Sequence, residues 1–500
     1  MKDEGKHAFF FIPHPSSFTM SLRPPNVTFY QRARQALNDP QLHIALDRAT
    51  DTLTTLRSRT MGTFVDGDAL RDQARMIRAH TLSRLDHYLA QFADAVEAAG
   101  GRVHWALDGA AANQIVLDIA RAHGVKTAVK GKSMVTEETG LNHVLQSAGI
   151  DVIETDLGER IIQLAGETPS HIIAPAIHKT KEQVGRLFHE KLGAPLTDVP
   201  EEMTAVARQS LRHDFLRADM GISGVNFGVA ETGTLALVEN EGNGRLTATA
   251  PRIHVAFMGI ERLVPTIADL EVMLQVLARS ATGQKLSVYT NLLTGPRRPG
   301  EPDGPDELHV VLVDNGRSRV LGGKLAEILY CIRCGACLNA CPVYRQIGGH
   351  AYGGVYTGPI GAVLSPALDG LDPWSELPHA SSLCGACREV CPVGIDIPRM
   401  LLELRHAGHE QGKSPWWLKI GLRMYRIVAT RPLMFKWAIA TASAATRLVA
   451  RSGWVRRLPP PLSGWTDYRN FPAFAREPFS TQVKRRRLRL GTKVGLKPRA

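Results

Sequence analysis

Cysteine is scarce in this sequence and is confined to two short motifs. The 500 residues include only seven cysteines, and all of them lie between Cys331 and Cys391. None is left elsewhere for scattered disulfide bonds, which argues for a reducing compartment. The two motifs are therefore the first candidates for the chemistry of the protein.

Long apolar runs and a secretion signal are also missing. The stretch between Lys436 and Arg447 comes nearest to a membrane span, but its ten uncharged residues fall short of the roughly 20 that a spanning helix needs. The N-terminus carries Asp3 and Glu4 and an apolar run of only four residues, which does not fit a signal peptide. We expect a cytoplasmic protein, with residues 1–19 as an upstream extension and Met20 as the alternative start.

A nucleotide-binding fingerprint is absent as well. No G-x-G-x-x-G lies between a predicted strand and a predicted helix, and GISGVNFG, from Gly221, has a different spacing. Hydride transfer within this chain is therefore not expected. Electrons would have to pass to a partner or to a metal cluster.

Acidic residues are nearly missing from the C-terminal region. From Lys413 onward there are 20 lysines and arginines against Asp467 and Glu477, while the whole chain has a net charge of +12. Five of the seven tryptophans lie in the same region. Such a segment could dock an acidic partner, lie on an anionic membrane, contact nucleic acid or form a solvated helix face. The tryptophans favour docking, with peripheral membrane contact second, and nucleic-acid binding is not expected.

The rest of the chain shows the pattern of an α/β protein. Apolar residues recur every three or four positions over residues 20–100, which predicts helices that end at Gly100 and Gly101. From Arg102 onward, short β-branched runs alternate with helical segments, which favours a parallel sheet covered by helices. Glycine and threonine cluster between strands in residues 221–315, and there we expect a sheet edge with exposed loops.

The cysteine spacing is the most specific signal in the sequence. Four cysteines follow C-x2-C-x2-C-x3-C-P, and the second motif repeats it as C-x2-C-x3-C-P: Cys331, Cys334, Cys337 and Cys341, then Cys384, Cys387 and Cys391. Zinc sites close with four ligands in paired knuckles and do not explain two copies with the Cys-Pro ending. Thiolates at this spacing are typical of iron–sulfur clusters, so we predict two 4Fe–4S clusters.

The ligands of the two clusters are expected to cross between the motifs, because the cysteine before the proline points to the other cluster. Cluster 1 would take Cys331, Cys334, Cys337 and Cys391, and cluster 2 would take Cys341, Cys384 and Cys387. Cluster 2 is therefore one thiolate short, and Ser381 stands where its fourth cysteine would be. It could be a 3Fe–4S cluster, a 4Fe–4S cluster with a ligand such as Ser381 or His379, or a cluster with an open iron. Both residues could also be ordinary loop residues.

Long segments outside the motifs resemble one known family. They are VKGKSMVTEETGLNHVL from Val129, GVAETGTLALVENEGNGRL from Gly228, CIRCGACLNACPVYRQIGGHAYG, VYTGPIGAVLSP and SSLCGACREVCP. In order and coverage they resemble the LutB-type iron–sulfur subunits of bacterial L-lactate utilisation complexes. The resemblance implies a LUD domain of the CoA-transferase/isomerase-like α/β type, followed by an α-helical ferredoxin domain with two clusters. The expected domains are an N-terminal extension and helix, the LUD domain, the ferredoxin domain and a basic Trp-rich region: residues 1–65, 66–315, 316–405 and 406–500.

The LUD segment offers two candidate catalytic residues. Glu231 follows a predicted strand beside glycines, and related folds place a nucleophilic glutamate in a comparable loop, which the resemblance permits here. Lys132, in VKGKSM, could bind a carboxylate or phosphate as a compact cation. The alternative interpretations are a turn glutamate and a surface lysine.

The resemblance implies electron transfer during oxidation of L-lactate to pyruvate, in a complex with LutA-like and LutC-like partners and an unidentified electron acceptor. Three other functions stay open. The chain could serve another hydroxy acid such as glycolate, or a heterodisulfide-type reductase. It could bind nucleic acid through its tail, or it could be a redox sensor with cluster 2 as its labile element.

Overall fold

The computed structural model describes most of the chain, namely residues 27–413, 416–458, 462–467, 469–479, 481–483 and 485. The chain divides into two compact units, residues 1–411 and 412–500, each of which is considered by itself. The predicted N-terminal extension, with Met20, lies outside the described residues. Among the helices that the structure describes, none has the length and apolar character needed to cross a membrane.

Four helices open the first unit, where the apolar spacing predicts helices. They are α1 (Phe29–Leu37), α2 (Pro40–Met61), α3 (Gly67–Ser83) and α4 (Leu85–Ala98). The side chains of Thr28, Asp39 and Asp66 accept hydrogen bonds from first-turn amides and so fix three of the starts. Each such cap stabilises a helix by about 1 kcal/mol. The fourth helix ends just before the predicted pair of glycines.

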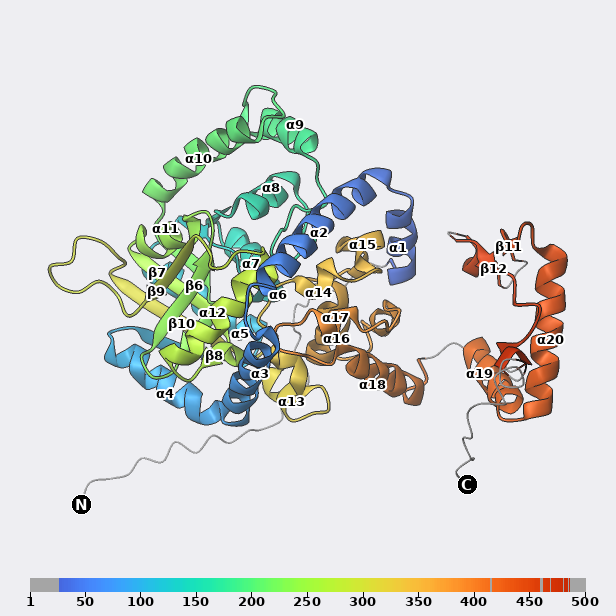
Figure 1. Ribbon diagram of the computed structural model, residues 1–500. Coiled ribbons are helices and arrows are strands. Elements are labelled where there is room, and N and C mark those ends of the chain that lie inside the picture. Colours follow the sequence, from blue (N-terminus) through green and yellow to red (C-terminus); the bar gives the residue numbers. More distant parts are fainter. Residues whose placement is uncertain are drawn as a thin grey trace, which may run out of the picture. The chain divides into compact units, whose positions relative to one another are not determined.

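A six-stranded sheet forms the centre of the first unit (Figure 1). Its strands lie in the order β1-β10-β7-β4-β2-β3, and each neighbouring pair is parallel. The strands are β1 (Arg102–Ala106), β2 (Thr127–Lys130), β3 (Asp151–Glu154), β4 (Met220–Gly224), β7 (Ile253–Gly259) and β10 (Glu307–Val313). The sheet confirms the predicted α/β class.

Both faces of this sheet are buried, because successive side chains of a strand point to opposite sides. Val311 packs into the core on the side of α5 (Gly109–Ala122), whereas its neighbour Val310 packs into a larger core on the other side. The larger core includes Phe92 of α4 and continues to Leu338 in the first cysteine motif. The sheet and the cysteine-bearing segment therefore share one core.

A smaller sheet, in the order β8-β5-β6-β9, follows β4 in the chain. It comprises β5 (Phe227–Val229), β6 (Thr234–Glu239), β8 (Leu263–Val264) and β9 (Tyr289–Leu293). The prediction that residues 221–315 form a sheet edge is wrong for β4, β7 and β10, which lie in the interior of the parallel sheet. The glycines reflect close packing there, since a Cβ on Gly221 would stand 1.8 Å from the carbonyl oxygen of Thr247.

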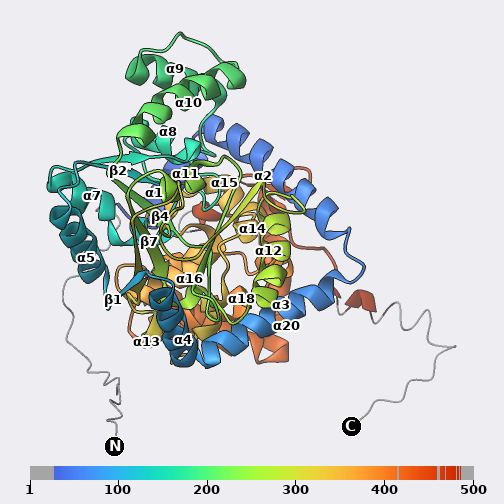
Figure 2. The ribbon, with the colours of Figure 1, turned by 90° about the vertical axis from the view of Figure 1, so that its left-hand side faces the viewer.

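Three helices form a lobe beyond β3, visible at the top of Figure 2. They are α8 (Leu157–Ala165), α9 (Lys181–Leu192) and α10 (Pro200–Arg217). The lobe has its own small core, which includes Ile161, Phe188 and Met203. Its chain then returns to the sheet as β4.

Helices, most of them short, carry and flank the cysteine motifs. They are α13 (Arg317–Leu321), η2 (Ala326–Tyr330), α14 (Ala336–Asn339), α15 (Tyr344–Ile347), η3 (His350–Tyr352), α16 (Gly358–Asp369), η4 (Leu377–His379), α17 (Ala386–Glu389) and α18 (Ile397–Glu410). Helix α2 packs on α14 and α15 (Figure 1), and α1 packs on η3. The guanidinium of Arg71 donates to the carbonyl oxygens of Glu389 and Cys391 at 2.9 and 3.0 Å. The N-terminal helices thus hold the second motif in place.

The second unit contains α19 (Trp416–Ala429), α20 (Pro432–Val449) and a short ladder of β11 (Trp454–Val455) with β12 (Phe471–Pro472). Trp416 and Trp437 remain 74% and 73% exposed, although they are among the largest apolar side chains of the unit. Helices that expose tryptophan beside arginine and lysine are suited to docking. Docking to a partner or a membrane surface stays a prediction.

Candidate iron–sulfur centre

The two cysteine motifs fold in the same way. In the first, Arg333 and Gly335 have φ values of +61° and +75°, and in the second, Leu383 and Gly385 have +55° and +86°. A four-residue helix follows each pair, α14 in the first motif and α17 in the second. Non-glycine residues rarely adopt positive φ, so the shared conformation at equivalent positions indicates a shared constraint.

The cysteine that ends each motif is held by a backbone amide. The amide of Tyr344 lies 3.5 Å from Sγ of Cys341, and the amide of Ile395 lies 3.4 Å from Sγ of Cys391. An amide that points at a sulfur favours the thiolate form, which is the form that binds iron.

Ser381 occupies the place of the missing cysteine. In the first motif the amide of Arg333 points at Sγ of Cys331, at 3.4 Å. In the second motif the amide of Leu383 donates to Oγ of Ser381, at 3.1 Å. The serine oxygen therefore stands at the position equivalent to the sulfur of Cys331. His379, the other candidate from the sequence, is exposed at the end of η4.

Four cysteines from both motifs surround one cavity. Its lining includes Cys331, Cys334 and Cys337 of the first motif and Cys391 of the second. The remaining wall is mostly apolar and includes Ile172, Ile332, Ile360, Val393, Ile395 and Ile397. These are the four residues that the sequence assigns to cluster 1, so the fold brings the predicted set together, and their role as ligands stays a prediction.

The other three cysteines form a second group. Burial raises the pKa of the Cys387 thiol to about 12, and the nearby Cys341 and Cys384 add to the rise. Cys384 itself is exposed, and hydrogen bonds from the backbone of Ala386 and the side chain of Ser382 lower its pKa. A cluster held by this group would have one cysteine at the surface.

The groups around the thiols fit iron–sulfur clusters. Burial raises the pKa of Cys334 to about 12, so a thiol there stays neutral unless a metal ion holds the sulfur as thiolate. Tyr352 is fully buried, and burial together with Cys341 raises the pKa of its hydroxyl. Within the described part of the chain that hydroxyl has no hydrogen-bond partner. A cluster sulfur would supply the missing acceptor.

Arginines from distant parts of the chain gather beside Cys331. Arg262, in the short helix η1 (Ile260–Arg262), donates to the carbonyl oxygen of Cys331 at 2.9 Å. Arg333 lies 3.3 Å from a carboxylate oxygen of Glu261, and Arg317 lies 2.6 Å from the other. Burial alone would raise the pKa of Glu261, but these arginines outweigh it and hold the pKa at about 2.

The charged side chains beside Cys331 carry more positive than negative charge. Arg317 also forms two hydrogen bonds with Glu138, at 2.8 and 2.9 Å, while Arg78 donates to the carbonyl oxygens of Leu263 and Leu329 at 2.7 and 3.0 Å. Four arginines thus face two glutamates. A cluster with four thiolates has a net negative charge, and neighbouring positive charge stabilises its reduced form.

Replacing Arg317 by methionine should lower the free energy of unfolding by about 3–5 kcal/mol, because buried Glu138 would lose its ion pair with Arg317 and buried Glu261 would keep only the longer one with Arg333, at 3.3 Å. Urea unfolding followed by circular dichroism measures the change. The matched control is Arg217→Met, since Arg217 also pairs with two carboxylates but is 42% exposed. The control should lose only about 1 kcal/mol or less. Equal losses in the two variants would contradict this account.

A second, larger cavity lies at the carboxyl ends of the parallel strands. The segments that follow β2, β3, β4 and β7 all contribute to its wall, as do the end of β6 and the end of α12 (Ile267–Ala281). Its polar residues include Lys132, Ser133, Asp156, Ser223, Asn226, Glu239, Glu241, Asn243, Glu261, Arg262 and Arg333. Ligands of open α/β sheets bind at this edge.

The two predicted catalytic residues lie apart. Lys132 is half-buried in the larger cavity, and its Nζ donates to the carbonyl oxygen of Ile173 at 2.7 Å. Glu231 is exposed and does not line that cavity. Its carboxylate instead accepts a hydrogen bond from the amide of Ile267, at the start of α12, at 2.7 Å. The catalytic roles of both residues stay predictions.

Sequence reasoning missed Glu241 and the arginines at this cavity. Arg333 had a visible signal, since it stands between two cysteines of the first motif. Arg262 and Glu241 had none, because only the folded sheet brings their loops to the same edge.

Comparison with known proteins agrees with both halves of the first unit. The LUD domain family matches residues 89–313, and the 4Fe-4S dicluster domain family matches residues 327–395. Lactate utilization protein B of Macrococcus caseolyticus is 46% identical, over 95% of this chain and all of that protein. Lactate utilization protein B of Shouchella clausii is 43% identical, and an uncharacterized electron transport protein, YkgF, of Escherichia coli is 44% identical; each alignment covers 93% of this chain and 98% of the relative. By these identities and this coverage, the chain belongs to the lactate utilization protein B family.

Proposed function

We propose that this chain is an iron–sulfur electron-transfer subunit that acts in the oxidation of L-lactate to pyruvate. The observation that carries the proposal is the cavity lined by four cysteines, three from one motif and one from the other. Relatives that are 46% and 43% identical to this chain are named for lactate utilisation, and the 4Fe-4S dicluster domain family matches the segment that carries the cysteines. The parallel sheet, the larger cavity and the two cysteine motifs lie in one unit, which suits transfer of electrons within the chain.

The proposed ligands follow the two groups of thiols. Cluster 1 is held by the four cysteines of the cavity, and cluster 2 by Cys341, Cys384 and Cys387, with Ser381 beside its fourth position. When bound, each cluster accepts and releases one electron at a time. Oxidation of lactate to pyruvate releases two electrons and two protons, so two clusters in one chain can take up both electrons.

The two clusters would adjoin each other. The pKa of the Cys337 thiol is raised first by burial and then by other thiols, among which is Cys387 of the second group. Helix α14, which carries Cys337, also contacts α17, which carries Cys387, so electrons can pass between the two groups within this chain. The exposed position of Cys384 makes cluster 2 the proposed exit toward an acceptor.

LutA-like and LutC-like subunits are the proposed partners, on the strength of the resemblance alone. They would complete the site of lactate oxidation, because the chain lacks a dinucleotide fingerprint and a cluster cannot accept a hydride. Lys132 is the proposed group for a substrate carboxylate. Glu231 remains a weaker candidate, because its carboxylate already serves the start of α12.

The decisive experiment adds L-lactate to the purified complex and follows the clusters by electron paramagnetic resonance (EPR). We expect signals of two reduced clusters, and none with D-lactate as the matched control. Glycolate tests the main alternative substrate. Reduction by glycolate but not by L-lactate would overturn the choice of substrate, and no reduction by any hydroxy acid would overturn the proposed function itself.

A further inference from the structure

The cavity at the carboxyl edge of the sheet almost reaches cluster 1. Ile172 lines this cavity and also lines the cavity of the four cysteines, so a single side chain belongs to both walls. Arg262 and Arg333 line the larger cavity, and the pKa of each is affected by Cys331. A molecule bound in the larger cavity would therefore lie next to the clusters.

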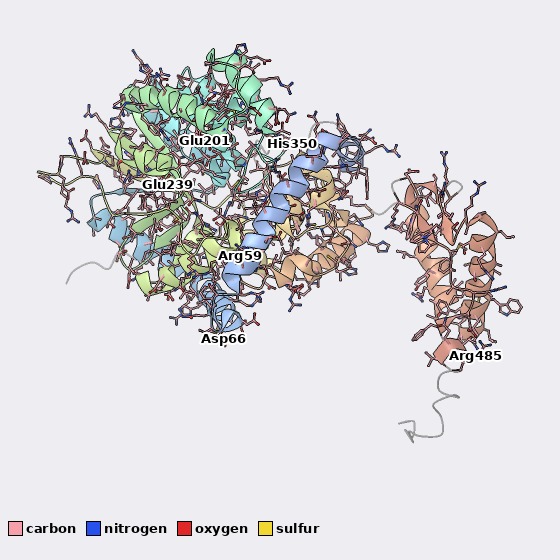
Figure 3. All side chains as sticks on the ribbon, turned by 45° about the horizontal axis from the view of Figure 1, so that its top comes forward. Arg59, Asp66, Glu201, Glu239, His350 and Arg485 are labelled. Carbon is pink, nitrogen blue, oxygen red and sulfur yellow. The ribbon has the colours of Figure 1, made fainter. Side chains whose placement is uncertain are left out.

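The acidic groups of the cavity are already engaged by protein donors. Glu239, labelled in Figure 3, accepts hydrogen bonds from the amides of Gly244 and Arg245 at 2.6 and 2.8 Å. Asp156 accepts from the amide of Glu159, at 3.1 Å, and so caps α8. These carboxylates have structural partners and need no cation.

Lys132 is engaged only in part. Its Nζ donates to one carbonyl oxygen, although an ammonium group has three protons to donate. Among the described residues, no carboxylate oxygen lies within 4.0 Å of it in an ion pair. A half-buried cation that lines a cavity and lacks an ion-pair partner calls for an anion from solution.

Glu241, an exposed residue, supplies a second polar contact, since its Oε2 accepts a hydrogen bond from the amide of Leu157 at 3.1 Å and its Oε1 is left for a ligand. It lines the same cavity, and Lys132 is one of the charges that act on its carboxyl group. The cavity wall desolvates that carboxyl, and Asp156 repels its charge, so its pKa is raised to about 7. Near neutral pH it exists in both forms, and it can accept a hydrogen bond from a hydroxyl or donate one to a keto oxygen.

We propose that this cavity binds a small 2-hydroxy- or 2-oxo-monocarboxylate, with the carboxylate on Lys132 and the oxygen of its second carbon on Glu241. The inference deepens the proposed function and rests on it, since L-lactate and pyruvate are the acids that it names. It concerns binding alone: the cavity holds the acid beside cluster 1, and Ile172 separates the two. The carboxylate of the ligand follows from Lys132, which lines the cavity and forms no ion pair among the described residues, and the choice of acid follows from the proposed function.

Three acids test the proposal on the full chain with both clusters present. L-Lactate and pyruvate can make both contacts, whereas propionate lacks the oxygen on its second carbon. Isothermal titration calorimetry should show weaker binding of propionate. Lys132→Met should weaken binding of all three acids at least tenfold, and Glu241→Leu should weaken only L-lactate and pyruvate, to the level of propionate.

Two further variants control for misfolding and for the loss of a lysine elsewhere in the chain. Lys132→Gln retains a donor for Ile173 but loses the charge, so it should behave like Lys132→Met even if the latter folds poorly. The matched control is Lys181→Met, because Lys181 pairs with Asp198 in the separate lobe, and binding should stay within twofold. Binding of L-lactate that is unchanged in both Lys132 variants would overturn the proposal.

The outcome separates this inference from the proposed function. If the chain binds none of the acids while L-lactate still reduces the clusters in the complex, the cavity is not the substrate site and the electron-transfer function stands. If L-lactate reduces no cluster in the complex, the proposed function fails whatever the cavity binds.

Discussion

Replacing Cys391 by alanine is expected to abolish cluster 1, although Cys391 belongs to the second motif. The residue lines one cavity with the first three cysteines of the first motif, so its loss leaves that cluster with three thiolates in an apolar wall. We expect iron content to fall to roughly half, because the apolar wall around cluster 1 offers no replacement ligand, whereas cluster 2 has Ser381 beside its fourth position. Chemical analysis of iron and EPR of the reduced protein measure the result.

Matched variants identify which cluster is lost. Cys331→Ala should leave the same residual EPR spectrum as Cys391→Ala, because both residues serve the cavity of cluster 1. Cys341→Ala and Cys384→Ala should share the other spectrum, since each of them influences the Cys387 thiol. If the residual EPR spectrum of Cys341→Ala instead matches that of Cys331→Ala, the crossed assignment of ligands is wrong.

The cysteine spacing predicted this pairing because the information is local. Three sulfurs within seven residues can face one cluster only through a tight turn, and the residue before each proline must then point away. The structure places the four expected cysteines around one cavity, although contacts from outside the motifs, such as that of Arg71 with the carbonyl oxygen of Cys391, help to hold them there. The same locality explains why Ser381 could be recognised as the missing ligand position from the sequence alone.

The larger cavity could not be predicted in this way. Lys132, Asn226 and Glu241 meet there only because β2, β4 and β6 end close together, and the order of the strands is not written in any one segment. Glycine was misleading for a related reason. At Gly221 it permits close contact with Thr247 in the interior, whereas the sequence suggests an exposed loop.

The candidate role of Glu231 shows a further limit of motif reasoning. Its glycine neighbours correctly indicated a turn, and the turn lies between β5 and β6. Which groups a turn residue faces depends on the helix that packs there, and the amide of Ile267 faces this one. Resemblance to a loop in related folds therefore identified an accessible carboxylate without identifying its partner.

The fourth ligand of cluster 2 can be tested by substitutions of Ser381. Its Oγ stands where the first motif has Sγ of Cys331, and each accepts from the amide two residues later. Arg405 holds the same loop by donating to the carbonyl oxygens of Pro378 and Ser381 at 2.8 and 3.1 Å. A cysteine at this position would therefore be held with its sulfur directed at the cluster.

We expect Ser381→Cys to give cluster 2 four thiolates and to protect it from loss of iron in air, whereas Ser381→Ala should convert it to the three-iron form. EPR of the oxidised protein before and after exposure to air distinguishes these forms, and His379→Ala, which alters the exposed alternative, is the control. If Ser381→Cys keeps both clusters but slows lactate oxidation in the complex, the fourth iron needs an exchangeable ligand to function. Full activity would make cluster 2 a simple relay. A Ser381→Ala protein with native iron content and an unchanged spectrum would exclude the serine oxygen as a ligand.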